Sequence, residues 1–230
     1  MKRDSDRRVA RPVAAWLCLL LGLWVHAGAG AETLGRNGGV RLLLHVEPYE
    51  MPPGGIQADP CTLLTPLTDV EQIVTEHAAI GDTVRVWAYL YTPREMLVRG
   101  VGFAIEYEGI DFIVSGACAP MIGQDPEIMG TWPESGSEIA AVWMPEAPRT
   151  GHLAPVAWFV LRALESDAYF GVGPGNSPFS GRVGDDNLPP RENRIWDYGR
   201  IGFGTRAGKL PIPDPRTLPS SGGAVEIRMR

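Results

Sequence analysis

The chain has 230 residues and a formal net charge of −6, a length that suits one domain behind a short leader. The first 31 residues hold five basic and two acidic side chains, so 16 Lys and Arg then remain against 25 Asp and Glu, a balance of −9. An acidic chain of this kind argues against nucleic acid and anionic membrane surfaces as partners.

Residues 1–31 are predicted to be a signal peptide. A basic stretch from Lys2 to Arg11 precedes thirteen apolar residues, 13–25, and small residues follow for cleavage after Ala29 or Ala31. A membrane anchor is the alternative, but thirteen residues fall short of the roughly 20 that span a bilayer. We therefore expect a secreted, periplasmic or cell-surface protein with no stable membrane span after cleavage, whose single domain covers residues 32–230.

The early elements are read from alternation and turn residues. Residues 40–47 (VRLLLHVE) alternate as a first strand, and residues 48–60 are rich in proline and glycine and form a loop that leads to Cys61. Residues 69–77 fit either one helical turn or a short strand, of which we favour the strand.

Residues 79–118 form the centre of the predicted fold. Apolar residues alternate from position 84, a proline-containing stretch at 92–95 interrupts them, and alternation resumes at 101 and again at 110. Three strands in forty residues, joined by short turns, predict an antiparallel unit.

The second half adds strands and long loops. Residues 119–137 are a polar insertion that contains Trp132, and residues 138–144 alternate as a strand. The apolar run 151–164 is predicted to be a strand packed on both faces, because its β-branched and aromatic content argues against a helix. A short strand at 168–172 follows.

The end of the chain differs in composition. Residues 173–223 are rich in proline and glycine, and residues 224–229 (AVEIRM) alternate as a closing strand. With eight or nine short strands and no amphipathic helix of three turns, the predicted class is all-β. We expect an antiparallel β-sandwich with long loops, of jelly-roll or immunoglobulin/cohesin-like type.

Two cysteines lie beyond the leader, Cys61 and Cys118, and an even pair in an exported chain predicts a disulfide. Two free thiols and a metal site are the alternatives. The metal site is weakly supported, since the chain has no CxxC and only three scattered histidines beyond the leader, His45, His77 and His152.

Several segments resemble cohesin domains, the carbohydrate-associated sandwiches of cellulosome scaffolds. GDTV at 81–84 is similar to the entry into an early strand, GVGFAIEY at 100–107 to the next strand, and 153–161 and 223–227 to later ones. Glu108-Gly109 stands where the family has Asp or Asn and a proline. The resemblance implies the fold more than it implies pairing with a dockerin.

No catalytic motif is present: the chain lacks a nucleophile elbow, a zinc-protease helix motif and a phosphate loop. Glu106 and Glu108 share one strand face, where a polysaccharide hydrolase could use them, but carboxylates on a solvent-facing strand are the simpler interpretation. The turn Asp185-Asp186-Asn187 is oxygen-rich and is either a structural calcium site or a solvated turn.

The aromatic residues Trp87, Tyr89 and Tyr91 lie on one face of the strand that begins at residue 83. An open row of rings could stack on a sugar chain. We expect instead that the face is covered by the 119–137 insertion or by the 173–223 segment, because large exposed apolar patches are uncommon in soluble proteins.

The sequence therefore predicts an exported, non-enzymatic module for adhesion, scaffolding or surface assembly, with no cofactor. A carbohydrate-binding module with Trp87, Tyr89 and Tyr91 as its ligand-binding residues is the alternative, and a secreted polysaccharide hydrolase is a further one. The expected partner is a surface protein or a polysaccharide.

Overall fold

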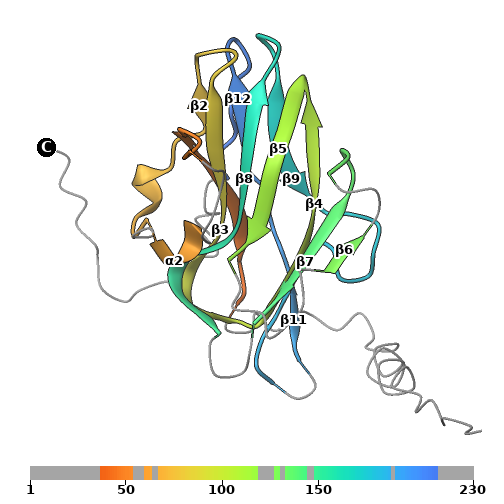
Figure 1. Cartoon of the computed structure of the whole chain (residues 1–230). Coiled ribbons are helices and arrows are strands. Elements are labelled where there is room, and N and C mark those ends of the chain that lie inside the picture. Colours follow the sequence, from red (N-terminus) through yellow and green to blue (C-terminus); the bar gives the residue numbers. More distant parts are fainter. Residues whose placement is uncertain are drawn as a thin grey trace, which may run out of the picture. The chain divides into compact units, whose positions relative to one another are not determined.

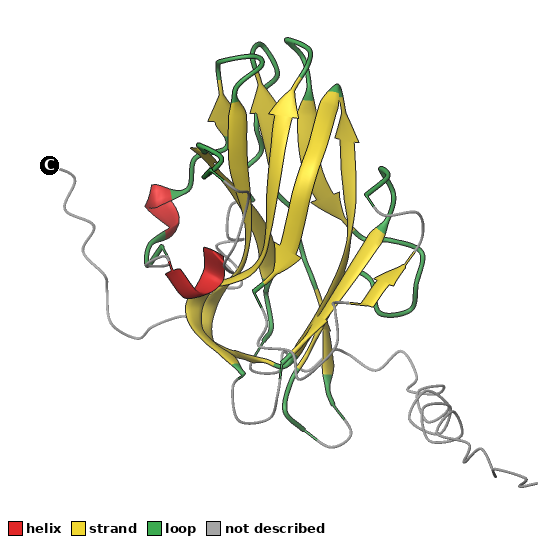
Figure 2. Ribbon diagram, viewed as in Figure 1, coloured by secondary structure: helices red, strands yellow, loops and turns green. Residues whose placement is uncertain are grey.

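The computed structural model describes residues 37–53, 60–63, 67–118, 127–129, 133–143, 148–187 and 190–211. In this part of the chain a four-residue helix, α2 (Pro60–Leu63), and a 3-10 turn, η1 (Val70–Gln72), accompany twelve strands (Figures 1 and 2). The strands are β1 (Arg41–Pro48), β2 (Glu76–His77), β3 (Thr83–Val98), β4 (Gly100–Glu108), β5 (Ile110–Ala117), β6 (Glu127–Met129), β7 (Glu138–Val142), β8 (Arg149–Ala163), β9 (Tyr169–Gly173), β10 (Arg182–Gly184), β11 (Glu192–Arg194) and β12 (Arg200–Phe203).

The strands form two packed sheets, which confirms the predicted all-β sandwich. One sheet has four strands in the order β1-β3-β8-β5, and the other has the order β11-β10-β4-β9-β12-β2, with β7 and β6 attached beside β4. The pairings are antiparallel except for the short β2–β12 pair. Among the described residues, no helix is long and apolar enough to cross a membrane.

The main core lies between the sheets and follows the period-two pattern of the sequence. Val84, Val86 and Ala88 point inward from β3 and meet Phe159 of β8 and Phe170 of β9 in one cluster of buried side chains. The Phe159 and Phe170 ring centroids lie 4.9 Å apart. Apolar burial of this kind is the main force that holds two sheets together.

Two predicted elements differ from the structure. Residues 92–95 do not end the strand: β3 continues to Val98, and its register with β8 shifts between Tyr91 and Met96. The interruption is therefore an irregularity that the long partner strand spans, not a turn. In 69–77, the strand is limited to β2 at Glu76–His77, and η1 forms at Val70–Gln72 because Asp69 caps it and Gln72 completes a capping box.

Residues 196–199 join the two sheets at one edge. The amide of Leu42 in β1 donates to the carbonyl of Asp197, and the amide of Gly199 donates to the carbonyl of Leu42. The chain then enters β12 in the other sheet. This segment therefore pairs with the edge of β1, where a closing strand is predicted from residues 224–229. Those residues, like the predicted leader at 1–31, lie outside the described part of the chain.

Candidate functional site

The aromatic strip on β3 is covered, as expected, but by a different segment from the one predicted. Trp87 and Tyr89 are only 4% and 3% exposed, and Tyr91 is half-buried. With Trp158 they form a second core on the outer face of the four-stranded sheet. The residues packed against it from the covering side are Tyr49, Cys61, Leu67, Val70 and Ile73.

The predicted covering segments, 119–137 and 173–223, contribute no described residue to this second core, and Trp132 lies outside the described residues. Among the described residues, the cover comes from 49–53, 60–63 and 67–73 of segment 49–73, together with Cys118 just after β5. Trp87 and Tyr89 therefore stabilise the fold in this structure and do not form an open row for a sugar.

A polar network fixes the rim of the second core. The indole Nε1 of Trp87 donates to Glu47 Oε1 at 2.8 Å, and Arg85 Nε donates to the same oxygen at 2.7 Å. The guanidinium of Arg85 lies 5.0 Å from the Tyr49 ring centroid and 4.9 Å from that of Trp87. The indole nitrogen of Trp87 and the guanidinium of Arg85 thus share a charged partner, the Glu47 carboxylate.

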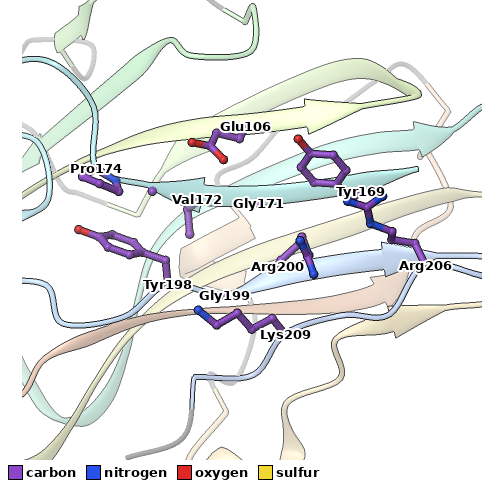
Figure 3. A pocket seen from close by; sticks show the side chains of 11 residues that line it. Glu106, Tyr169, Gly171, Val172, Pro174, Tyr198, Gly199, Arg200, Arg206 and Lys209 are labelled. Atoms are coloured by element: carbon purple, nitrogen blue, oxygen red, sulfur yellow. The ribbon is translucent and has the colours of Figure 1, made fainter. Parts of the chain in front are cut away.

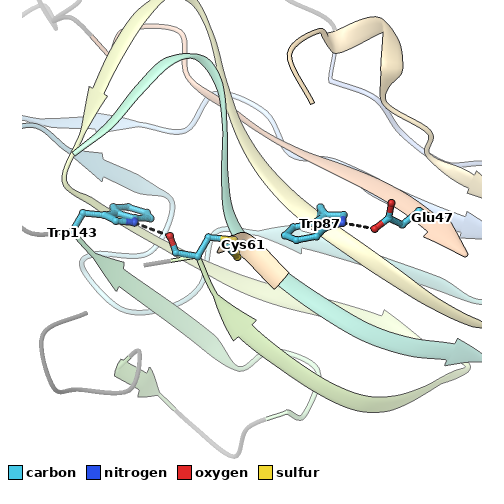
Figure 4. The surroundings of a disulfide bond; sticks show 5 residues. Glu47, Cys61, Trp87 and Trp143 are labelled. Carbon is cyan, nitrogen blue, oxygen red and sulfur yellow. Dashed lines mark hydrogen bonds between the residues drawn. A yellow bond between two sulfur atoms is a disulfide. The ribbon is translucent and has the colours of Figure 1, made fainter. Parts of the chain in front are cut away.

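The predicted disulfide between Cys61 and Cys118 is confirmed, with 5.3 Å between the Cα atoms. It ties the cover to β5 (Figure 4). The carbonyl of Cys118 also accepts a hydrogen bond from Trp143 Nε1 at 3.0 Å, which links the disulfide to the main core. At Gly116 a Cβ would lie 2.6 Å from the Trp158 ring, so this glycine gives the second core the space it needs.

The predicted oxygen-rich turn is organised by its own hydrogen bonds. Asp185 is buried, and its carboxylate accepts from the amides of Asn187, at 3.1 Å, and Arg191, at 2.8 Å, and from the Asn187 side chain. These bonds are typical of a turn closed by aspartate. Among the described residues no group of three or more His, Cys, Asp or Glu could hold a metal ion.

The outer face of the other sheet carries an open groove, which the sequence analysis did not predict. Strand register places Glu106 of β4 opposite Gly171 of β9, and Gly171 opposite Arg200 of β12. Arg200 in turn pairs with Lys209 across an isolated bridge. Directly opposed residues in a sheet point to the same face, so a row of charges crosses three strands with a glycine in its middle.

The floor of the groove is bare because β9 alternates strictly. In YFGVG, residues 169–173, Phe170 and Val172 point into the main core, and the other side of the strand presents Tyr169, Gly171 and Gly173. Two glycines in succession on this side leave a furrow between β4 and β12. The groove has a volume of about 280 Å³ and is lined by Glu106, Tyr169, Gly171, Val172, Gly173, Pro174, Tyr198, Gly199, Arg200, Arg206 and Lys209.

A return loop completes the cationic wall of the groove (Figure 3). After β12 the chain turns at Gly204, which has φ 57°, and comes back so that the amides of Arg200 and Lys209 each donate to the other's carbonyl. A Cβ at Gly202 would lie 2.0 Å from the carbonyl oxygen of Arg206, so only glycine lets the loop cross β12 here. The crossing brings Arg206 over Tyr169.

The positive side chains are held in place in different ways. The guanidinium carbons of Arg206 and Arg200 lie 4.9 and 5.8 Å from the Tyr169 ring centroid, within the range of cation–π contacts. Lys209 Nζ donates to Asp197. The Nε of Arg200 is buried and has no hydrogen-bond partner among the described residues.

The far end of the groove is closed by Tyr198 and Pro174. Burial raises the pKa of Tyr198 to about 12, so its hydroxyl is neutral at physiological pH. The adjoining loop is anchored by buried Glu138, which accepts hydrogen bonds from the amides and hydroxyl of Asn176 and Ser177. Burial by itself raises the pKa of Glu138, but these hydrogen bonds outweigh it and the pKa is lowered.

The groove is lined by one of the two carboxylates that the sequence places on β4. Glu106 and Glu108 are both exposed on the outer side of β4, in agreement with the solvent-face interpretation, and Glu106 lines the groove. Among the described lining residues Glu106 is the one carboxylate, whereas glycosidases act with two.

A sequence signal for the groove existed in the alternating glycines of residues 169–173. Their partners on β4 and β12 are set by long-range register, which the sequence pattern does not give.

Comparisons with known proteins add little. No protein-family model matches the chain, and a search of curated proteins gives no significant match. A cohesin module from a family 33 glycoside hydrolase of Clostridium perfringens is similar over 56% of this chain and 90% of its own, with 9% identity and a TM-score of 0.40. The seventh ScaB type I cohesin of Pseudobacteroides cellulosolvens is similar over 60% and 91%, with 12% identity and a TM-score of 0.36. The likeness to cohesins concerns the fold, and because both TM-scores are below 0.5 we infer no function from it.

Proposed function

We propose that this protein is an exported, non-enzymatic binding module that attaches to a surface polymer through the groove on β4, β9 and β12. The observation that carries the proposal is the difference between the two outer faces of the sandwich. One face is sealed by residues 49–73 and a disulfide, and the other has a glycine-floored groove walled by charged and aromatic side chains. Concave sites with a few converging polar groups are where proteins hold ligands.

Two further features support the proposal. The disulfide is of the kind found in proteins that leave the cytosol, in agreement with the leader predicted at residues 1–31. The single carboxylate of the described groove lining favours holding a ligand over cleaving it. Adhesion, scaffolding and surface assembly all require an attachment site of this type, and so does a carbohydrate-binding module.

A groove-filling variant tests the proposal. A Cβ at Gly171 would meet its nearest atoms, in Arg200 and Glu106, at 3.7–3.8 Å, so a larger residue fits the strand but occupies the furrow. The matched control is Gly100 in β4, where a Cβ would approach only the Ala141 carbonyl oxygen, at 3.8 Å. Gly100 does not line the groove.

We would measure retention of the mature protein on cellulose, on chitin, and on beads that carry polyuronate, sulfated glucan or extracellular proteins. Gly171→Val should lose retention on whichever support holds the unmodified protein, while Gly100→Val keeps it. Equal retention of both variants would show that attachment does not use the groove.

A further inference from the structure

The groove carries a group of positive charges, in contrast to the acidic chain as a whole. The chain has a net charge of −6, yet three cations, Arg200, Arg206 and Lys209, line one wall. Lys209 is the sole lysine after Lys2. Asp197 pairs with Lys209, but Arg200 and Arg206 form no ion pair among the described residues, and two like charges placed together are stabilised by a negative ligand.

We propose that the groove binds an acidic glycan, a chain of sugar rings that bear carboxylate or sulfate groups; this inference rests on the function proposed above. The acidic group of the ligand lies against Arg200 and Lys209, and its hydroxyls donate to Glu106 on the opposite wall. Arg200 lines the groove, and the terminal N–H groups of its guanidinium supply the donors for the acidic group.

The geometry favours a charged sugar over a neutral one. Neutral sugars stack on open aromatic faces, whereas Tyr169 already has two guanidiniums close to its ring, at 4.9 and 5.8 Å. The ring therefore orients the cations, and the cations are what the groove presents. A planar guanidinium that is held in place loses little freedom when it binds a carboxylate or sulfate.

The geometry also favours a glycan over an acidic peptide. Extended peptides bind by adding a strand to a free sheet edge. β9 is paired with β4 on one side and β12 on the other, and β12 is also paired with β2 and with Lys209. The three strands under the groove thus have no free edge there, and the ligand must be recognised by side chains. Charged side chains facing one another across a bare floor suit a ligand rich in hydroxyls.

Calorimetric titration with four polymers tests the inference: polygalacturonate, dextran sulfate, neutral dextran and poly-glutamate. We expect binding to polygalacturonate, dextran sulfate or both, and the stronger of the two identifies the acidic group. Dextran and poly-glutamate should give no binding. Higher salt should weaken the interaction.

Substitutions of charged residues test whether the groove binds a negative ligand. Arg200→Gln and Lys209→Gln should each weaken binding about tenfold to a hundredfold, the usual effect of losing one charge-assisted hydrogen bond. Glu106→Gln keeps an acceptor for hydroxyls and removes a negative charge, so binding should stay within about threefold or become tighter. The matched control is Arg162→Gln on the other sheet, an exposed arginine paired with Asp111, which should change nothing.

The other outcomes overturn the inference in distinguishable ways. Binding to dextran that Gly171→Val abolishes would leave the proposed function intact and refute an acidic ligand. Equal binding to poly-glutamate would identify an acidic polypeptide instead. If Arg200→Gln tightened binding and Glu106→Gln weakened it, the cationic wall would not hold the acidic group and the inference would be refuted. No binding to any of the four polymers would refute the acidic glycan, whereas the retention assay would still decide whether the groove attaches to another polymer.

Discussion

On the outer face of the four-stranded sheet, Trp87, Tyr89 and Trp158 pack under a covering segment. On the outer face of the other sheet, Gly171 and Gly173 line an open groove. Aromatic residues on a strand face are the usual candidates for ligand contact, yet here they lie under the cover. The groove lies where side chains are missing. The comparison teaches that a row of aromatics indicates burial as readily as binding, and that glycines at alternate strand positions can mark an open site.

The largest expected effect is on the covered face. Trp87 is 4% exposed and donates to Glu47, so Trp87→Ala should lower the free energy of unfolding by about 3–5 kcal/mol. The matched control is Trp196→Ala, because Trp196 is 52% exposed and its loss should change stability by no more than about 0.5 kcal/mol. Urea unfolding of both variants makes the comparison. Similar stabilities would mean that Trp87 is not part of a second core.

The disulfide should have the next largest effect. Cys61 and Cys118 are 57 residues apart, and closing a loop of that length restricts the unfolded chain by about 4 kcal/mol in the entropy model. Replacing both cysteines by serine should therefore destabilise the protein by about 2–4 kcal/mol and loosen the segment 49–73. Hydrogen exchange should rise in that segment more than in β9 and β12. Thiol titration of the mature, non-reduced protein should find no free thiol.

The alternation of the sequence was sufficient to predict the sandwich and its main core. The β-branched and aromatic content of 151–164 predicted a strand packed on both faces, and β8 is buried on both faces over Val156–Leu161, where Trp158 and Phe159 point to opposite sides. It could not predict which segment covers Trp87, since residues 49–73 have no period and their position depends on the disulfide. Cys61 was the available clue: a bridge to Cys118 brings this segment to the sheet whose outer face needs a cover.

The groove was beyond sequence reasoning for a different reason. The pattern of residues 169–173 showed two glycines on one face of a strand. The charges on either side come from positions 106 and 200, and strand pairing over long sequence distances brings them together. The return of the chain to Lys209 depends on the turn at Gly204, which a sequence pattern does not place in space.

Acid should weaken the covered face through His45. Its Nδ1 accepts a hydrogen bond from the amide of Val74 at 3.0 Å, which requires the neutral ring. Burial lowers the pKa of His45, and nearby Glu47 opposes this only in part. Because the unfolded chain binds the proton more readily, stability should fall as the pH drops below about 6.5 and level off below the folded pKa. The loss should be about 1 kcal/mol, the usual net contribution of one hydrogen bond. In His45→Gln, unfolding curves at pH 7.5 and 5.5 should differ less than in the unmodified protein.

The groove should tolerate substitution with the smallest change in stability. Arg200→Gln removes a half-exposed side chain that has no hydrogen-bond partner at Nε among the described residues, so the free energy of unfolding should change by no more than about 0.5 kcal/mol. Thermal unfolding, run beside Trp87→Ala, checks this. A loss as large as that of Trp87→Ala would mean that Arg200 supports the fold and that the groove is not specialised for binding.

If the two outer faces have opposite roles, NMR of the amide groups during titration with an acidic glycan will separate them. We expect shifts to concentrate at Gly171, Gly173, Arg200 and Lys209 and to leave residues 83–91 unchanged. Shifts that concentrate at Trp87, Tyr89 and Tyr91 instead, with residues 169–173 unaffected, would contradict it.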